Sequence, residues 1–174
     1  MGKQTVDLQK IKLLLLDVDG VMTDGAFYIH SDGTESKRFC VFDGHRIKMW
    51  LRAGLQCAII SGRESKATTI RAEQLGIQHV LQGCREKVTA FEQTLEKLNL
   101  TPDEVVFVGD DLLDLPLLRR VGFAVAVANA ATEVKTLADY ITTNTGGNGA
   151  VGEVIEYLLK ATGRWEELIR RYMV

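Results

Sequence analysis

The sequence predicts an α/β fold, in which a parallel β-sheet is flanked by helices on both faces. Two observations lead to this class. Short apolar runs alternate along the chain with segments whose apolar positions repeat at the helical period. The runs are apolar at nearly every position, which is typical of parallel strands that are buried on both faces. Because a helix returns the chain to the start of the next strand, this alternation favours a parallel sheet.

Five runs are expected to form the strands, and five segments between and after them are expected to form the helices. The first run, 11–16, contains four consecutive leucines and is apolar enough to be buried on both faces. The remaining expected strands are 55–60, 78–81, 104–108 and 123–127. The expected helices lie at about 44–53, 64–75, 85–98, 112–121 and 150–161, each with an apolar stripe that can pack on the sheet.

One segment, 26–42, interrupts the alternation. Its sequence, AFYIHSDGTESKRFCVF, has two arms with an alternating pattern on either side of Asp32 and Gly33. An Asp-Gly pair at the centre of such a pattern predicts a β-hairpin. The hairpin follows the first strand closely, so we expect it to project beside the end of that strand.

The composition bounds the class of protein. The chain of 174 residues fits one domain, 1–174, and its 46% of hydrophobic residues can supply a core. A net charge of −2 gives no electrostatic reason to expect nucleic acid as a partner. No apolar run approaches the roughly 20 residues of a membrane helix. The three cysteines, Cys40, Cys57 and Cys84, have no CxxC spacing, which indicates reduced thiols in a cytoplasmic protein and argues against zinc.

Polar side chains follow four of the predicted strands. The carboxyl ends of parallel strands meet at one edge of a sheet, and ligands of open α/β sheets bind at that edge. These residues are Asp17 and Asp19 after the first strand, Ser61, Gly62 and Arg63 after the second, Lys87 after the third, and Asp110, Asp111 and Asp114 after the fourth.

The residue types at this edge match the requirements of phosphoryl transfer. Neighbouring carboxylates such as Asp17 and Asp19 repel unless a cation lies between them or one keeps a proton. Asp110 adds a third carboxylate, and a set of oxygen ligands favours Mg²⁺. Ser61, at a strand-to-helix turn, and Lys87 can hold phosphate oxygens. A nucleophilic carboxylate, a proton-transfer carboxyl, a metal and a phosphate cradle together indicate an aspartyl-phosphate mechanism.

Each of these motifs also has an ordinary structural interpretation. Asp17 and Asp19 could be a helix cap or a solvated loop, Ser61 and Gly62 an ordinary helix start, and Lys87 a solvated lysine. The functional interpretation depends on their joint occurrence at four strand ends.

The motifs resemble those of the haloacid dehalogenase superfamily, in order and across nearly the whole chain. They are DVDGVMTDG at 17–25, SGR at 61–63, Lys87, and GDDLLDLP at 109–116. The resemblance implies a Rossmann-like sheet, with Asp17 as the nucleophile and Asp19 as the general acid and base. It implies that Ser61 and Lys87 hold the phosphoryl group. It further implies that Mg²⁺ binds to Asp17, the backbone carbonyl of Asp19 and Asp110, with Asp111 and Asp114 supporting the metal less directly.

Within this superfamily the chain is most similar to the 3-deoxy-D-manno-octulosonate 8-phosphate phosphatase family. The similarity rests on the short length, DGVMTDG, the hairpin, FDG at 42–44, LGI at 75–77, QG at 82–83 and GGNGAVGE at 146–153. It implies a phosphatase of lipopolysaccharide biosynthesis without a cap domain. It also implies a homotetramer in which the hairpins, 26–42, pack together and a neighbouring subunit covers each site. Docking of the tail, 163–174, on its own domain is the default expectation, and a contact with a neighbour's site, which the tail can reach in that family, is the alternative.

Two positions depart from the family pattern and bear on the substrate. Arg46 stands where Gly is expected, and Gly152 stands where Arg is expected. Both lie outside the four motifs, so they affect the identity of the substrate more than the type of reaction. Arg63 and Arg46 are candidates to pair with the carboxylate of a sugar acid, or have structural roles instead. With Ser61, Gly62, Lys87 and Asp43 they complete the candidate substrate-binding set.

Three other functions remain open from the sequence. The substrate could be a nine-carbon sialic-type sugar-acid 9-phosphate, or the enzyme could be a promiscuous small-molecule phosphatase. A protein of another class would be a catalytically inactive, tetramer-forming module. The intact set Asp17, Asp19, Lys87 and Asp110 argues against an inactive module, because clustered carboxylates are a liability without a metal.

Overall fold

Six parallel strands form a single sheet in the computed structural model, which describes residues 6–174. The strand order is β5-β4-β1-β6-β7-β8, so β1 lies near the middle although it comes first in the chain. The strands are β1 (Leu13–Leu16), β4 (Gln56–Ile60), β5 (His79–Leu81), β6 (Val105–Gly109), β7 (Phe123–Ala126) and β8 (Tyr140–Ile141). The expected domain, 1–174, begins with five residues that lie outside the described part of the chain.

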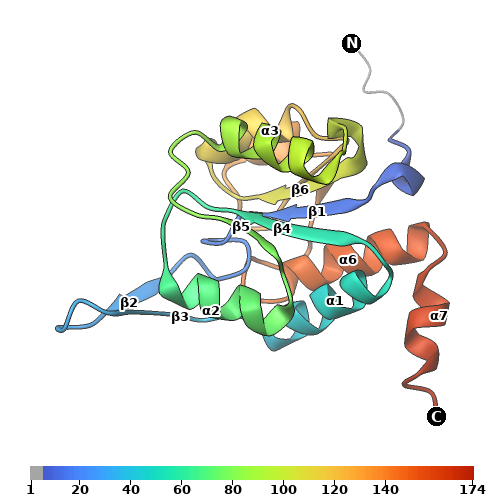
Figure 1. Ribbon diagram of the computed structural model, residues 1–174, viewed down its shortest axis with the longest axis horizontal. Helices are drawn as coiled ribbons and strands as arrows, with labels where there is room; N and C mark the ends of the chain where they lie inside the picture. The colour runs from blue at the N-terminus through green and yellow to red at the C-terminus, as the bar shows by residue number, and fades with distance from the viewer. Residues whose placement is uncertain (1–5) are drawn as a thin grey trace.

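Helices cover both faces of this sheet, which confirms the predicted fold class (Figure 1). The helices α1, α2 and α6 lie on one face, and α3 lies on the other with α4 against it. Their bounds are α1 (Val41–Arg52), α2 (Lys66–Leu75), α3 (Lys87–Leu98), α4 (Leu115–Leu118), α5 (Thr132–Leu137), α6 (Ala150–Ala161) and α7 (Trp165–Arg170). Three short 3₁₀ helices complete the list: η1 (Leu8–Lys10), η2 (Pro102–Glu104) and η3 (Leu112–Asp114).

The four leucines of β1 form the centre of the core. β1 pairs with β4 on one side and β6 on the other, with Leu14 opposite both Cys57 and Val106. All four leucine side chains are fully buried, because one face of the strand meets α1 and α6 and the other meets α3. Burial of one such side chain stabilises the fold by roughly 2 kcal/mol. The strand therefore holds the residues that follow it in a fixed position.

Helices α1 and α6 pack against each other beneath the sheet. The apolar face of α6 contributes Val151, Val154, Ile155, Leu158 and Leu159, all of them buried. On α1, Trp50 is buried and its indole N–H donates a 2.7 Å hydrogen bond to the carbonyl of Gln56, which satisfies the one polar group of the side chain.

The structure differs from the predicted elements at three places. The segment 112–121 forms η3 and the short α4, because Asp111 and Asp114 cap a tight first turn there. Helix α1 begins at Val41 rather than residue 44, so the hairpin is shorter than the expected 26–42. Helix α5 and strand β8 were not predicted, since a helix of six residues and a strand of two give too short a pattern.

The hairpin consists of β2 (Phe27–Ile29) and β3 (Glu35–Lys37), paired antiparallel. At its tip the Asp32 carboxylate accepts a hydrogen bond from the Thr34 N–H at 2.9 Å, and Gly33 takes the positive φ of +82° that the turn requires. The hairpin extends away from the rest of the chain, and Tyr28 and Ile29 are 71% and 76% exposed (Figure 1).

The C-terminal segment packs on α1 of its own chain. The Tyr172 hydroxyl lies 2.8 Å from His45 Nε2 and accepts a 2.6 Å hydrogen bond from Arg52, and the Arg46 guanidinium lies over the Trp165 ring. Across the described residues, none of the helices has the length and apolarity needed to span a bilayer.

Candidate active site

The residues that follow β1, β4 and β6, together with the start of α3, enclose a pocket of about 430 Å³ at the carboxyl edge of the sheet. We call it the edge pocket. It is lined by Asp17, Asp19, Gly25, Ser61, Gly62, Arg63, Cys84, Arg85, Lys87, Asp110, Asp111, Leu113 and Asp114. The four strand ends that the sequence singled out therefore meet at one place.

A buried ion triplet forms the floor of the edge pocket. Lys87 Nζ lies 2.9 Å from Asp17 Oδ1 and 2.6 Å from Asp114 Oδ1. Burial acts to lower the pKa of the Lys87 ammonium, but the charges of Asp17 and Asp114 outweigh it and raise that pKa. Lys87 is therefore a permanent cation, placed beside the carboxylate that the sequence predicts to be the nucleophile.

Three carboxyl groups, those of Asp17, Asp110 and Asp114, lie close together beside one ammonium, that of Lys87. Burial, reinforced by the charge of Asp114 and opposed by Lys87, raises the pKa of Asp17 to about 6. Burial and the charges of Asp17 and Asp114 raise the pKa of Asp110 to about 8. Among the described residues, the buried Oδ1 atom of Asp110 has no hydrogen-bond partner. A carboxylate held in this state is short of a cation.

The geometry of the carboxylates fits a hard divalent cation. One oxygen each from Asp17, Asp110 and Asp114 lie within 4.8 Å of one another, and all the donors are oxygens. The fold leaves room for this cluster through Gly20, whose φ is +88°. A Cβ at that position would approach Asp110 Oδ2 to 2.0 Å. Gly20 is therefore required by both its conformation and its contact.

Asp114 connects Lys87 with the loop that carries Asp110. It is fully buried, and its Oδ2 atom accepts hydrogen bonds from the backbone N–H groups of Asp110 at 2.8 Å and Asp111 at 3.3 Å. Its Oδ1 atom accepts from Lys87. The carboxylate thus fixes the loop that carries Asp110 and connects it to the cation beside Asp17.

Asp19 points toward the hairpin side of the edge pocket. Lys37 of β3 donates hydrogen bonds to both Asp19 carboxylate oxygens, at 2.7 and 3.0 Å, and Arg63 Nε lies 3.6 Å from Oδ2. Sequence reasoning missed Lys37. In the hairpin Lys37 pairs with Phe27 and shares a face of β3 with Glu35, but no local signal shows that this face turns toward Asp19.

Ser61 and Gly62 line the pocket as predicted, but they do not begin a helix. Ser61 is buried, and its hydroxyl accepts a 3.3 Å hydrogen bond from the Arg63 N–H. Helix α2 starts at Lys66, so Ser61 lies in the loop before it and does not have the helix terminus that the sequence suggested.

The structure places Asp43 and Arg46 outside the edge pocket. Both lie in the first turns of α1, which face α6 rather than the sheet edge. Asp43 is buried and accepts hydrogen bonds from the Gly152 N–H at 2.7 Å and the Gly149 N–H at 3.3 Å, so it anchors the start of α6. Arg46 pairs with Glu156 on α6 at 3.3 Å. Neither residue lines the edge pocket of this chain, and their part in binding the substrate stays a prediction.

Carboxylates and a lysine gathered at the switch point of a parallel sheet are the groups that a phosphoryl-transfer hydrolase needs. The chain matches the family model of haloacid dehalogenase-like hydrolases over residues 57–155. It is 46% identical to the Escherichia coli K12 3-deoxy-D-manno-octulosonate 8-phosphate phosphatase KdsC over 159 residues, covering 91% of this chain and 85% of that protein.

Solved structures give the same result. The 3-deoxy-D-manno-octulosonate 8-phosphate phosphatase of Moraxella catarrhalis, in complex with magnesium, phosphate and KDO, is 41% identical with a TM-score of 0.92, covering 95% of both chains. The Yersinia pestis phosphatase of the same name is 42% identical with a TM-score of 0.90, covering 91% of this chain and 86% of that one. The chain belongs to the 3-deoxy-D-manno-octulosonate 8-phosphate phosphatase family of haloacid dehalogenase-like hydrolases.

Proposed function

We propose that this protein is a Mg²⁺-dependent phosphatase that hydrolyses 3-deoxy-D-manno-octulosonate 8-phosphate to the free sugar acid and phosphate, in lipopolysaccharide biosynthesis. The observation that carries the proposal is the buried Lys87 between Asp17 and Asp114, beside Asp110, whose Oδ1 atom has no hydrogen-bond partner among the described residues. The relatives of the same family, 46% identical to this chain, bear the name of this activity. We further propose that residues 1–174 act as one catalytic unit.

The proposed reaction has two steps, both at the carboxyl end of β1. A carboxylate oxygen of Asp17 attacks phosphorus while the ester P–O bond breaks and Asp19 gives a proton to the departing sugar oxygen. Water then attacks phosphorus with Asp19 accepting its proton, and the aspartyl P–O bond breaks to release phosphate.

The other residues of the edge pocket hold the phosphoryl group and the metal. Lys87 and the Ser61 loop face the phosphoryl oxygens, and Asp17, Asp110 and the backbone carbonyl of Asp19 would hold Mg²⁺. When bound, the cation offsets the repulsion between the attacking carboxylate and the phosphate dianion. Without a cation, burial together with the charges of neighbouring carboxylates raises the pKa of Asp17 to about 6 and that of Asp110 to about 8.

The substrate is tested by phosphate release with Mg²⁺ across a matched panel. The panel holds the eight-carbon sugar-acid 8-phosphate, a nine-carbon sialic-type 9-phosphate, and common hexose and pentose phosphates. We expect strong preference for the eight-carbon acid. Preference for the nine-carbon acid, or low activity on every member, would show that the departures at Arg46 and Gly152 accompany another substrate or a promiscuous enzyme.

The mechanism is tested by Asp17→Asn. Asn keeps the size of the side chain but is a far weaker nucleophile, so we expect phosphate release to fall to background. Unchanged phosphate release would refute the aspartyl-phosphate mechanism. Absence of any release from the wild-type protein would favour the alternative of an inactive module.

We also propose a homotetramer in which hairpins of neighbouring chains pack together. The exposed Tyr28 and Ile29 on β2, with Val41 and Phe42 at the start of α1, support it because such apolar groups gain by being covered. Light scattering at micromolar concentration should give four times the mass of the chain. A monomer would remove the argument for a subunit-covered site.

The three free cysteines support a cytoplasmic location.

A further inference from the structure

Lys37 lies beside the edge pocket in contact with Asp19, and the proposed mechanism gives it no role. It belongs to the hairpin, whose tip and outer face are exposed, yet the Lys37 side chain itself has no exposed surface. A lysine is rarely buried unless its charge is paired. Its ammonium is paired with Asp19, the carboxyl to which the proposed function gives the proton transfers.

The contact between Lys37 and Asp19 fixes the orientation of that carboxyl. The Nζ atom lies 2.7 Å from Oδ1 and 3.0 Å from Oδ2, so one ammonium contacts both oxygens and holds the carboxylate plane. Arg63 approaches Oδ2 from a second direction at 3.6 Å. A proton donor must be aligned with the departing oxygen, and small displacements of a catalytic group cost large factors in rate.

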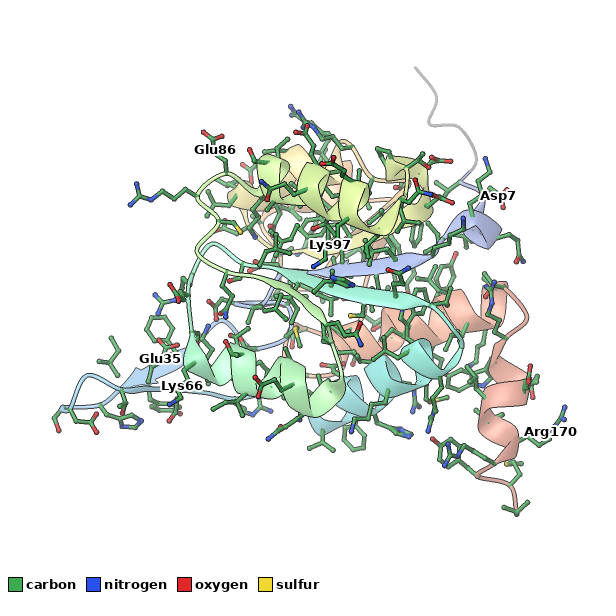
Figure 2. All side chains as sticks on the ribbon, in the orientation of Figure 1. Asp7, Glu35, Lys66, Glu86, Lys97 and Arg170 are labelled. Carbon is green, nitrogen blue, oxygen red and sulfur yellow. The ribbon has the colours of Figure 1, made fainter. Side chains whose placement is uncertain are left out.

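The base of the hairpin is itself held against the pocket. The Arg63 guanidinium lies 4.0 Å from the centre of the Phe27 ring, and it donates a 2.9 Å hydrogen bond to Glu35. Figure 2 shows Glu35 at this base, where β3 passes the start of α2 at Lys66. Phe27, Glu35 and Lys37 therefore form one inward face of the hairpin, locked to Arg63 and Asp19.

We propose that Lys37 is a positioning residue, through which the hairpin orients Asp19 for proton transfer to the leaving group. The inference rests on the proposed function, because it assumes that Asp19 gives the proton to the departing oxygen. It adds that the hairpin completes the active site of its own chain, whatever its part in assembly.

The test compares leaving groups in Lys37→Met. Met keeps the length of the side chain without the charge. We measure kcat/KM, which reports the steps through release of the leaving group, for the sugar-acid phosphate and for p-nitrophenyl phosphate. The sugar oxygen needs a proton to depart, whereas p-nitrophenolate leaves without one. We expect about a hundredfold loss for the sugar phosphate, and less than about fivefold for the aryl phosphate.

Two variants serve as controls. Arg38→Met removes a cation from the adjacent position, where the side chain is exposed and pairs with Asp24 outside the pocket, so both rates should stay near wild type. Lys37→Arg keeps a cation and should restore most of the rate on the sugar phosphate. Circular dichroism melting of each variant shows whether the fold is retained.

Equal losses of kcat/KM on both phosphates would overturn the inference, since they would indicate a structural role or direct binding of the phosphoryl group. Unchanged rates on both would overturn it equally. If the wild type hydrolyses the aryl phosphate but not the eight-carbon acid, the proposed substrate fails, and the comparison is made with another alkyl phosphate that it does hydrolyse. If the wild type releases phosphate from none of these esters, the proposed phosphatase function fails together with the inference.

Discussion

Replacing Asp110 by Asn should make the metal-free protein more stable, although Asp110 is proposed as a metal ligand. The Asp110 carboxyl is buried among Asp17 and Asp114, and its Oδ1 atom has no hydrogen-bond partner among the described residues. Without a cation the folded chain must keep this group protonated or accept the repulsion. Asn has the same shape and no charge to neutralise.

The magnitude follows from the pKa of Asp110, which is raised from 3.8 to about 8. At pH 7 the folded chain holds a proton that the unfolded chain has released, which costs about 1.4 kcal/mol for each unit between 3.8 and 7. The full cost is about 4 kcal/mol. Because the group is partly accessible to water, we expect Asp110→Asn to gain about 2 to 4 kcal/mol, or roughly 5–15 °C in Tm.

The assay is urea unfolding in the presence of a chelator at pH 7, followed by circular dichroism. Asp111→Asn is the matched control, because Asp111 is adjacent and exposed, and Asn replaces Asp well as the cap that accepts from the Leu112 N–H. It should change stability by less than about 0.5 kcal/mol. With Mg²⁺ added, the wild type should gain stability and Asp110→Asn should not.

A metal-free Asp110→Asn protein that is no more stable than wild type would refute this reasoning. It would mean that the pocket already neutralises Asp110 without a metal. The carboxylate cluster would then no longer imply a cation.

Three further changes test the same cluster. Gly20→Ala should destabilise the fold by about 2 kcal/mol or more and weaken Mg²⁺ binding. The new Cβ would meet Asp110, and the φ of residue 20 is positive. Thermal melting without and with Mg²⁺ measures the loss of stability and the loss of binding. Lys87→Met should cost about 3–5 kcal/mol in urea unfolding, since it leaves two buried carboxylates unpaired, and a loss below 1 kcal/mol would contradict this. In chelator, the free energy of unfolding should fall as pH rises from about 4 to about 8. The folded chain holds protons on Asp17 and Asp110, whose pKa values are about 6 and about 8, after the unfolded chain has lost them. A free energy of unfolding that rises over this range would show that the pKa values of these two carboxyl groups are not raised.

The strand ends and their polar residues could be predicted because each signal is local. A short apolar run such as the four leucines predicts a strand buried on both faces when it alternates with helical segments, and the parallel sheet then brings Asp17, Ser61 and Asp110 to one edge. The predicted bounds of α6, 150–161, agree with the structure because its apolar stripe is continuous. No packing information was needed for these elements.

The positions of Asp43, Arg46 and Lys37 depend on packing that a local pattern does not contain. The FDG stretch marked a motif, but the face of α1 that carries Asp43 is decided by contact with α6. Lys37 stands in the second strand of the hairpin, whereas its partner Asp19 follows β1 and precedes the hairpin, 18 residues earlier in the chain. Predicting this pair requires knowing how the hairpin packs against the loop that follows β1.

Strands β1 and β6 lie side by side in the sheet, although residues 17–104 separate them along the chain. The Asp17 and Asp110 carboxylates therefore become neighbours only when β6 inserts next to β1. A chain emerging from the ribosome carries the first aspartate long before the second exists, so a partly made protein has no complete charge cluster. Activity at this site would then appear only after β6 has paired with β1.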